Sequence, residues 1–370
     1  MKIAALDIRA CRTSAEAIRG AALKEETSER DGLDFMVYTL KTECGREATM
    51  FGFAGRTALG TGHHAAASLR PFIVGRDALD REGAWHAFRK ADRWWLHLPI
   101  YAYGPIDTCL WLLGAEAAGQ PLWRYLGGGR AELPTYASSL VLPGPDAYAA
   151  EALTVKGAGY KAYKIHPPGK SLAEDIEIHE AVRDAVGADY TLMSDPVQPY
   201  TYDEALRLGR VLERLGYLWY EEPLPDENFA GLRALTNALD IAVIGTEVLA
   251  KHPYSLAEVC ATRVVDGLRA DVSWTGGVTG TVKTAHLAEA FQMPCEVHTS
   301  ILAPLELANL HICAATHTRY FEVLWPRDAF DFGLKGGLPL KDGIATPPDK
   351  PGLGAEIDWD MIDNATIAEL

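Results

Sequence analysis

At 370 residues and 48% apolar composition, the chain is long enough for a large hydrophobic core with a smaller unit beside it. Its formal net charge of −15 argues against binding to nucleic acid or to an anionic membrane, because both require a basic face. The six cysteines are scattered without CxxC pairs, and we find no membrane-spanning apolar run and no secretion signal. We therefore expect reduced thiols and a cytoplasmic protein.

The first part of the chain, residues 1 to about 130, lacks a repeating strand–helix rhythm. Its apolar patterns predict three strands of a small antiparallel sheet, in the segments MKIAALDIRACR, DFMVYTLKTECG and ATMFGFAG. The segment from about Leu79 to Leu126 has helical periodicity. These patterns indicate an α+β unit at the start of the chain.

Residues 131 to 325 alternate between short apolar runs and helical patterns, which is the sequence form of a parallel sheet. After LPTYASSLV, five runs each end in an ionisable side chain, namely KAYKIH, YTLMSDP, YLWYEEP, AVIGTE and CEVHTS. Ionisable groups at successive strand ends favour a closed barrel, whose active site lies at the carboxyl ends of its strands. Beyond Trp325, frequent Pro and Gly predict short extended pieces rather than helices.

Asp195, Glu221 and Glu247 follow one another at intervals of 26 residues (221 − 195 and 247 − 221), which is one strand–helix unit per step. Equal spacing places them at one rim of the barrel. Three carboxylates that converge in a partly desolvated site raise each other's pKa values, so their joint presence implies a compensating cation. Oxygen ligands favour a hard ion, and we expect one Mg²⁺. Ordinary helix caps or loop acids are the alternative, which the equal spacing of all three disfavours.

With SDP, WYEEP and GTE in this order, a lysine strand before them and a histidine strand after them, the chain resembles the enolase superfamily, specifically its mandelate racemase subgroup. The resemblance spans nearly the whole chain. It implies a (β/α)7β TIM-type barrel over residues 131–325 and an α+β capping domain over residues 1–130, to which a C-terminal segment, residues 326–370, returns. It also implies that the three carboxylates are the metal ligands and that the chain forms homo-oligomers.

The resemblance assigns further roles by strand position. A His-Asp dyad corresponds to His298 and Asp271, with His298 as the candidate base and Asp271 fixing its tautomer. Glu322 on strand eight corresponds to a substrate-binding catalytic glutamate, which must be protonated to donate a hydrogen bond to an enediolate oxygen. The subgroup commonly has Lys-x-Lys on strand two, whereas this chain has Lys164 and His166 on one side of that strand. Lys164 is then a cation for the substrate carboxylate, and His166 is an acid, a base or a substrate-binding group.

In the family, two loops of the capping domain cover the barrel mouth. They correspond here to Thr13–Leu33 and to the Gly-rich stretch Gly52–Ala66. Arg56, His63 and His64 in the second stretch are candidates to reach the substrate, and Arg56 is the one we assign to substrate binding. Solvated loop side chains are the alternative for all three.

These roles imply chemistry on a small-molecule carboxylate. Removal of the hydrogen next to the carboxylate gives an enediolate, whose charge Mg²⁺ stabilises. Histidine is shorter than lysine, so that His166 reaches only a substrate hydroxyl or carboxylate and His298 is the single proton-transfer group. One base suffices for β-elimination of water, whereas racemisation needs a group on each face of the carbon. We therefore expect a dehydratase of an aldonic or aldaric acid sugar.

Three alternatives to the dehydratase remain open. The first is a racemase or epimerase, with His166 and His298 on opposite faces of the carbon. The second is a cycloisomerase that uses the same intermediate. The third is a metal-binding barrel that has lost catalysis and acts as a binding protein.

Overall fold

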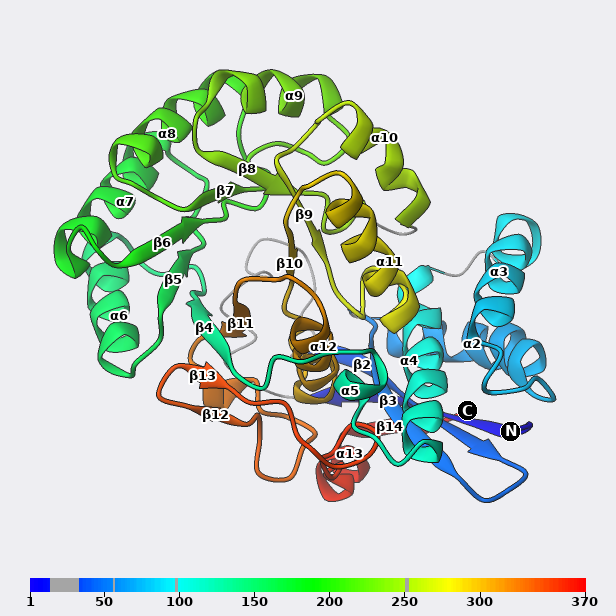
Figure 1. Ribbon diagram of the computed structural model, residues 1–370. Coiled ribbons are helices and arrows are strands. Elements are labelled where there is room, and N and C mark those ends of the chain that lie inside the picture. Colours follow the sequence, from blue (N-terminus) through cyan, green and yellow to red (C-terminus); the bar gives the residue numbers. More distant parts are fainter. Residues whose placement is uncertain (14–32, 56, 97–98, 250–252) are drawn as a thin grey trace.

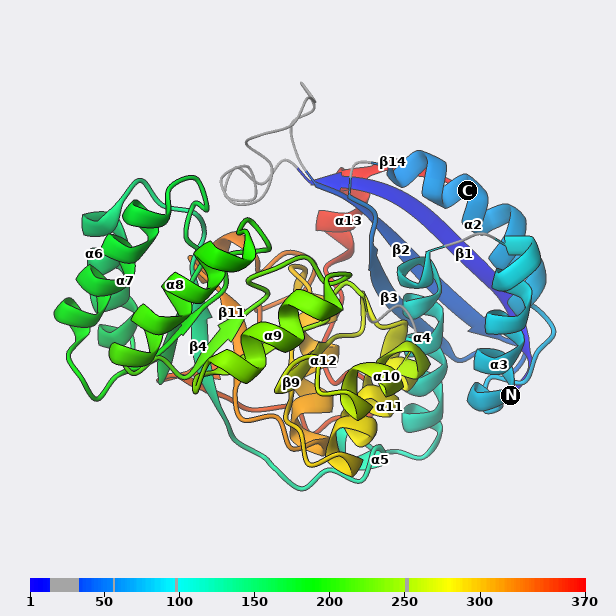
Figure 2. The ribbon, with the colours of Figure 1, turned by 90° about the horizontal axis from the view of Figure 1, so that it is seen from above.

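The computed structural model describes residues 1–13, 33–55, 57–96, 99–249 and 253–370. A ring of strands and helices forms one part, and a smaller sheet with its own helices forms the other (Figure 1, Figure 2). This mixed α/β arrangement confirms the fold class expected from the sequence.

The smaller sheet contains strands from both ends of the chain, in the order β14-β1-β2-β3. All neighbours in it are antiparallel, as predicted. The strands are β1 (Ile3–Thr13), β2 (Leu33–Thr42), β3 (Glu47–Phe53) and β14 (Thr366–Glu369). The helices that accompany this sheet and lead into the ring are α2 (Ala58–Ile73), α3 (Arg81–Ala91), α4 (Ile100–Ala117) and α5 (Leu122–Tyr125). The chain end therefore returns to the sheet that its beginning forms (Figure 2).

The Gly-rich stretch Gly52–Ala66 differs from the loop that the sequence predicted, because α2 begins within it at Ala58. Residues three or four apart are buried along this helix, which gives it one apolar face: Ala58, Gly62, Ala65, Leu69 and Ile73. His63 and His64 lie on the exposed side of α2. Arg56 and most of the first predicted loop, residues 14–32, lie outside the described residues.

The ring is a barrel of parallel strands. In the part of the chain that the structure describes, hydrogen-bonded neighbours run from β10 through β9, β8, β7, β6, β5 and β4 to β11. The strands are β4 (Leu133–Ser138), β5 (Ala162–Ile165), β6 (Thr191–Ser194), β7 (Trp219–Glu221), β8 (Ala242–Gly245), β9 (Gly267–Ala270), β10 (Cys295–Val297) and β11 (Phe321–Leu324). Side chains join the two ends of this path, since Val297 N donates to Thr318 Oγ1 at 3.1 Å and Arg319 Nε to Glu296 at 2.5 Å.

Helices follow the strands and cover the outside of the barrel (Figure 1). They are α6 (Pro145–Gly157), α7 (Leu172–Val186), α8 (Tyr202–Arg214), α9 (Phe229–Ala238), α10 (Leu256–Ala261), α11 (Gly277–Ala290) and α12 (Ala303–Ala315). The sequence encodes their starts locally. At α8, for example, Thr201 and Glu204 form a capping box that satisfies free N–H groups of the first turn.

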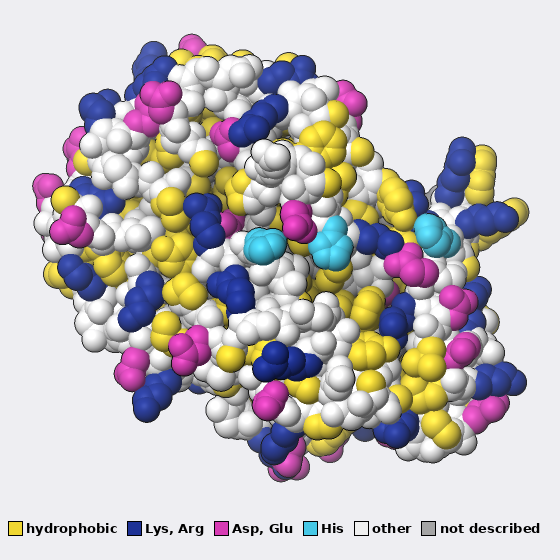
Figure 3. Space-filling model, in the orientation of Figure 1, with side chains coloured by type: hydrophobic (Ala, Val, Ile, Leu, Met, Phe, Trp, Pro, Cys, Tyr) yellow, Lys and Arg dark blue, Asp and Glu magenta, His cyan; other side chains and the backbone are white. Residues whose placement is uncertain are grey.

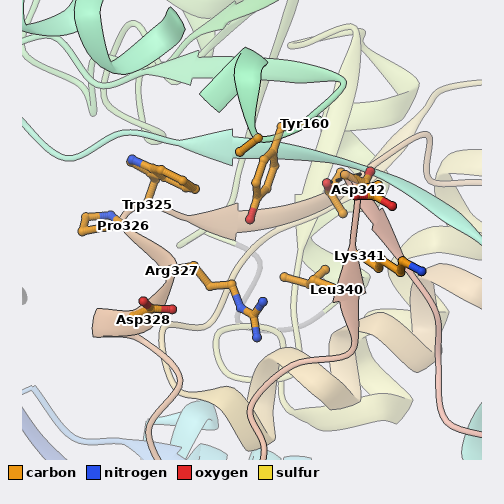
Figure 4. Close-up of a pocket in the computed structure, with 11 residues that line it drawn as sticks. Tyr160, Trp325, Pro326, Arg327, Asp328, Leu340, Lys341 and Asp342 are labelled. Carbon is orange, nitrogen blue, oxygen red and sulfur yellow. Dashed lines mark hydrogen bonds between the residues drawn. The ribbon is translucent and has the colours of Figure 1, made fainter. Parts of the chain in front are cut away.

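Beyond β11 the chain forms the short strands β12 (Leu340–Lys341) and β13 (Ile344–Ala345), and then the helix α13 (Trp359–Ala365). Strand β13 pairs antiparallel with β4 and is not one of the parallel strands of the barrel. A cavity of about 340 Å³ lies between this tail and the outer side of the barrel, between Tyr160 and Trp325 on one side and Arg327 and Lys341 on the other (Figure 4). Its lining includes none of the site residues predicted from the sequence, so this cavity is separate from the candidate active site.

Candidate active site

The barrel interior begins with a layer of apolar side chains, one from each of five neighbouring strands: Tyr136, Ala162, Met193, Trp219 and Ile244. Side chains alternate along a strand, so the residue two positions further on points to the same side. Lys164, Asp195 and Glu221 stand at those next positions after Ala162, Met193 and Trp219. The apolar layer is therefore the floor on which the polar site is built.

Lys164 lies at the centre of this polar layer. Its Nζ is 2.9 Å from Asp195 Oδ2, 3.2 Å from Glu221 Oε1 and 2.8 Å from Glu322 Oε1, and its side chain is 1% exposed. Burial acts to lower the lysine pKa, but the three carboxylates outweigh it and hold the pKa well above its ordinary value. These contacts favour the charged form of Lys164, in keeping with the cation role that the resemblance implies.

Arg269 is a second buried cation, which the sequence reasoning missed. It is fully buried, with Nε 2.7 Å from Glu221 Oε1 and a terminal nitrogen 2.5 Å from Glu322 Oε2. The other oxygen of Glu221 accepts from Trp219 Nε1 at 2.9 Å. A signal was available in the sequence, because Arg269 stands two positions before Asp271 and so shares its side of β9.

Glu322 differs from the expectation that it is protonated. Burial acts to raise its pKa, but Lys164 and Arg269 outweigh burial and hold the pKa well below its ordinary value. Its Oε2 also accepts a hydrogen bond from the backbone N–H of Thr299 at 3.1 Å. Each of these contacts favours the ionised form of Glu322, whereas the resemblance implied a protonated one.

Glu247 enters the site through a local change in the backbone. Alternation from Ile244 alone would send residue 246 inward and residue 247 outward. Thr246, however, has φ of 72°, an uncommon conformation for a β-branched residue, and this turns Glu247 toward the other site residues. Burial raises the pKa of Glu247 well above its ordinary value, and the nearby carboxylate of Glu222 adds to the effect.

His298 and Asp271 form the dyad that the resemblance implied, with Nδ1 of His298 2.6 Å from Asp271 Oδ2. Asp271 is itself fixed, because its other carboxylate oxygen accepts from the backbone N–H groups of Ser273 at 2.5 Å and Trp274 at 2.8 Å. Nε2 of His298 lies 3.1 Å from Glu247 Oε1. The imidazole is therefore oriented by Asp271 and presents Nε2 to the carboxylate side of the site.

His166 lies beside Asp195 at the other edge of the polar layer. Its Nε2 is 3.0 Å from Asp195 Oδ2, and its Nδ1 is 2.7 Å from the backbone oxygen of Ser139. Burial acts to raise the pKa of Asp195, but Lys164 and His166 lower it to below its ordinary value.

Tyr163, next to Lys164 on β5, faces outward as alternation predicts. Its hydroxyl donates to Glu151 on helix α6 at 2.8 Å.

The side chains of the three predicted metal ligands are not gathered into a metal site in this structure. Among the residues that the structure describes, no group of three His, Cys, Asp or Glu side chains is arranged to hold an ion. Asp195 and Glu221 are instead paired with Lys164, and Glu221 also with Arg269, because buried carboxylates take the cations within hydrogen-bonding reach.

The donor chemistry nevertheless fits a hard divalent ion. Carboxylate oxygens come from three successive strands, which is the ligand type that Mg²⁺ prefers. Burial and the carboxylates of Glu222, Glu221 and Asp195 raise the pKa of Glu247, and Arg269 acts against them. A divalent cation bound there would offset the repulsion among these carboxylates. The residues that would hold the ion are therefore Asp195, Glu221 and Glu247.

The described helices include none with the length and hydrophobicity that crossing a bilayer requires. On the face shown in Figure 3, basic side chains are scattered among acidic and apolar ones.

Comparison with known proteins identifies the family. Residues 147–361 match the model of the enolase C-terminal domain-like family, and the chain belongs to the enolase superfamily. Its relatives include an arabinonate dehydratase of Saccharolobus solfataricus, 30% identical over 296 residues that cover 78% of this chain and 79% of that protein. The crystal structure of a D-glucarate dehydratase from Agrobacterium tumefaciens complexed with magnesium is 32% identical, covers both chains completely and superposes with a TM-score of 0.88.

The relatives of this chain also include enzymes with other activities. An L-Ala-D/L-Glu epimerase of Bacillus subtilis is 29% identical over 301 residues, which cover 79% of this chain and 78% of that protein. The superfamily assignment made from SDP, WYEEP and GTE is thereby confirmed, and at the level of the family the relatives support a dehydratase.

Proposed function

We propose that the protein is a Mg²⁺-dependent dehydratase of an aldonic or aldaric acid. The observation that carries this proposal is the His298–Asp271 pair at 2.6 Å, oriented toward a group of carboxylates and one buried lysine. Relatives that are named as acid sugar dehydratases support the substrate class. When bound by Asp195, Glu221 and Glu247, Mg²⁺ supplies positive charge that stabilises the negative charge developing on the substrate carboxylate.

His298 is the base in this proposal. Its Nε2 exchanges the contact with Glu247 for the hydrogen on the carbon next to the substrate carboxylate, and Asp271 stabilises the imidazolium that forms. A positioned base contributes roughly 10²–10⁴-fold in rate, about 3–5 kcal/mol, which is only part of the barrier lowering that enzymes achieve. Most of the acceleration therefore comes from electrostatic stabilisation of the enediolate. Lys164, whose charged form the surrounding carboxylates favour, contributes to that stabilisation.

Elimination then needs no second base. The proton that His298 removes passes to the departing β-hydroxyl, so that one C–H and one C–O bond break, a C=C bond forms and water leaves. The resulting enol then tautomerises to the keto acid. His166, held between Asp195 and the Ser139 carbonyl, orients a substrate hydroxyl or carboxylate. Ionised Glu322 acts here through Lys164 and Arg269, whose positions it fixes, and not as a hydrogen-bond donor to the enediolate.

The test is a panel of aldonic and aldaric acids incubated with Mg²⁺ in D2O, with detection of keto-acid product and of deuterium in unreacted acid. We expect keto acid with wild-type protein, at least 10²-fold less with His298→Asn, and unchanged turnover with His286→Asn, an exposed histidine on α11. Deuterium in unreacted acid without keto acid would instead identify a racemase or epimerase. Ring closure without loss of water would identify a cycloisomerase. If no acid changes, the result would favour the alternative that the protein is a binding protein without catalytic activity.

A further inference from the structure

Asn309, on helix α12, joins the ends of the two strands that carry the dyad. Its Oδ1 accepts from the backbone N–H of Val272 at 3.0 Å, and its Nδ2 donates to the backbone oxygen of His298 at 3.0 Å and to Ser300 Oγ at 2.9 Å. The side chain is fully buried. Val272 directly follows Asp271, so the amide bridges the two members of the dyad through their backbones.

The Asn309 bridge continues the connection between β9 and β10 beyond the last backbone hydrogen bond of their ladder. The ladder between β9 and β10 runs to Ala270 and Val297, and His298 N donates to Ala270 O at 2.9 Å. The dyad therefore stands at the point where the backbone ladder between the two strands ends, and Asn309 supplies the next link. The Asn309 amide supplies both an acceptor for Val272 and a donor for the His298 carbonyl. An ionised carboxylate lacks the donor, and an apolar side chain lacks both groups.

Glu306 fixes the same segment from one turn earlier on α12. Its Oε1 accepts from the backbone N–H of Ser300 at 2.5 Å and from the hydroxyl of Thr299. Burial raises the pKa of Glu306 to about 8, so it is protonated at neutral pH and adds no charge beside the dyad. Residues three positions apart share one face of a helix, and α12 thus directs two polar side chains at the segment from His298 to Ser300.

We propose that Asn309 is a positioning residue, which sets the separation of Asp271 and His298 and thereby the aim of the base. This inference rests on the proposed function for its catalytic consequence, but its structural content stands on the dyad alone. A displacement of a reacting group by about 1 Å costs on the order of 10²-fold in rate. Loss of the amide bridge is therefore expected to lower kcat by about that factor while leaving KM within about twofold.

The experiment compares Asn309→Leu and Asn309→Asp with wild-type protein and with Thr236→Val as the matched control. Thr236 is buried on α9 and donates to Val264 O at 3.0 Å, so its replacement also removes a buried hydrogen bond, but one that lies before the start of β9, whereas the dyad lies beyond its end. The first readout is the low-field proton resonance of the His298 Nδ1–H that faces Asp271, assigned by its loss in His298→Asn. The second is the kcat and KM for the acid that wild-type protein dehydrates.

We expect the resonance to be lost or shifted in both Asn309 variants and kept in Thr236→Val, with kcat lowered about 10²-fold only in the Asn309 variants. A resonance and a kcat that are unchanged in Asn309→Leu would overturn the inference, as would an equal loss of kcat in Thr236→Val. If Asn309→Leu does not fold, Asn309→Asp decides by the same criteria, since it retains the size and the acceptor for Val272. If wild-type protein dehydrates no acid, the proposed function fails, and the resonance alone then tests the positioning role.

Discussion

Removal of Arg269 tests how the buried charges of the site balance. In Arg269→Met, Glu221 and Glu322 each lose a guanidinium partner, at 2.7 and 2.5 Å. They keep Lys164 as a shared cation, together with their neutral donors Trp219 and Thr299. Breaking a buried ion pair by removing one partner costs about 3–5 kcal/mol. Domains are typically stable by only about 5–15 kcal/mol, so the metal-free variant is expected to unfold at a much lower urea concentration than wild-type protein.

Mg²⁺ should reduce this loss. Removal of a cation beside Glu221 increases the attraction of the site for another cation, and a ligand that binds only the folded state stabilises it according to its affinity. Urea unfolding is therefore measured with Mg²⁺ and with chelator, for Arg269→Met and for Arg183→Met. Arg183 is the control, because it is buried but donates to backbone carbonyls, among them those of Leu215 and Tyr190. An equal destabilisation of Arg269→Met in Mg²⁺ and in chelator would refute the reasoning.

Three further predictions concern single positions. Glu247→Gln should weaken Mg²⁺ binding by roughly tenfold or more in a calorimetric titration, and wild-type affinity would remove Glu247 from the ligand set. Burial raises the pKa of Asp107 to about 7, so this carboxyl stabilises the folded state below its unfolded pKa of about 4 and loses that contribution as pH rises to about 7. Asp107→Asn should therefore gain stability relative to wild-type protein over that range in urea unfolding, and a constant difference would contradict the burial argument. A Cβ at Gly280 would lie 1.9 Å from a backbone oxygen, whereas one at Gly60 on α2 meets nothing within 4 Å; Gly280→Ala should cost about 1–3 kcal/mol or more in thermal unfolding, and Gly60→Ala should be neutral or stabilising.

The part of the site that the sequence predicted depends on strand alternation. Once Met193 and Trp219 are inside the barrel, Asp195 and Glu221 follow at the next inward positions, and period two suffices to place them. Glu247 shares the spacing but reaches the site through the positive φ of Thr246. No residue preference indicates that conformation, because a β-branched residue disfavours it.

The ionisation of the site could not be predicted in the same way. The resemblance implied a protonated Glu322, but Lys164 and Arg269 lie beside it and favour its ionised form. Both cations come from strands far from Glu322 in the sequence, so the sequence did not indicate these contacts. Nothing in the sequence singles out Asn309, because its role depends on contacts with two strand ends. Roles of this kind depend on tertiary contacts, which one sequence does not contain.

The loop predicted over Gly52–Ala66 shows a further reason for error. The family resemblance implied a loop there, but the apolar residues after Ala58 recur at helical spacing and pack one face of α2 onto the smaller sheet. Burial of that face outweighs the low helix propensity of glycine.

The most direct test of the mechanism uses an acid substrate that carries deuterium on the carbon next to its carboxylate. Release of that deuterium to water is followed for wild-type protein with Mg²⁺, for the same protein after chelation, and for His298→Asn with Mg²⁺. We predict release in the first case alone. Undiminished release after chelation, or from His298→Asn, would contradict the account of a metal held by Asp195, Glu221 and Glu247 beside a histidine base.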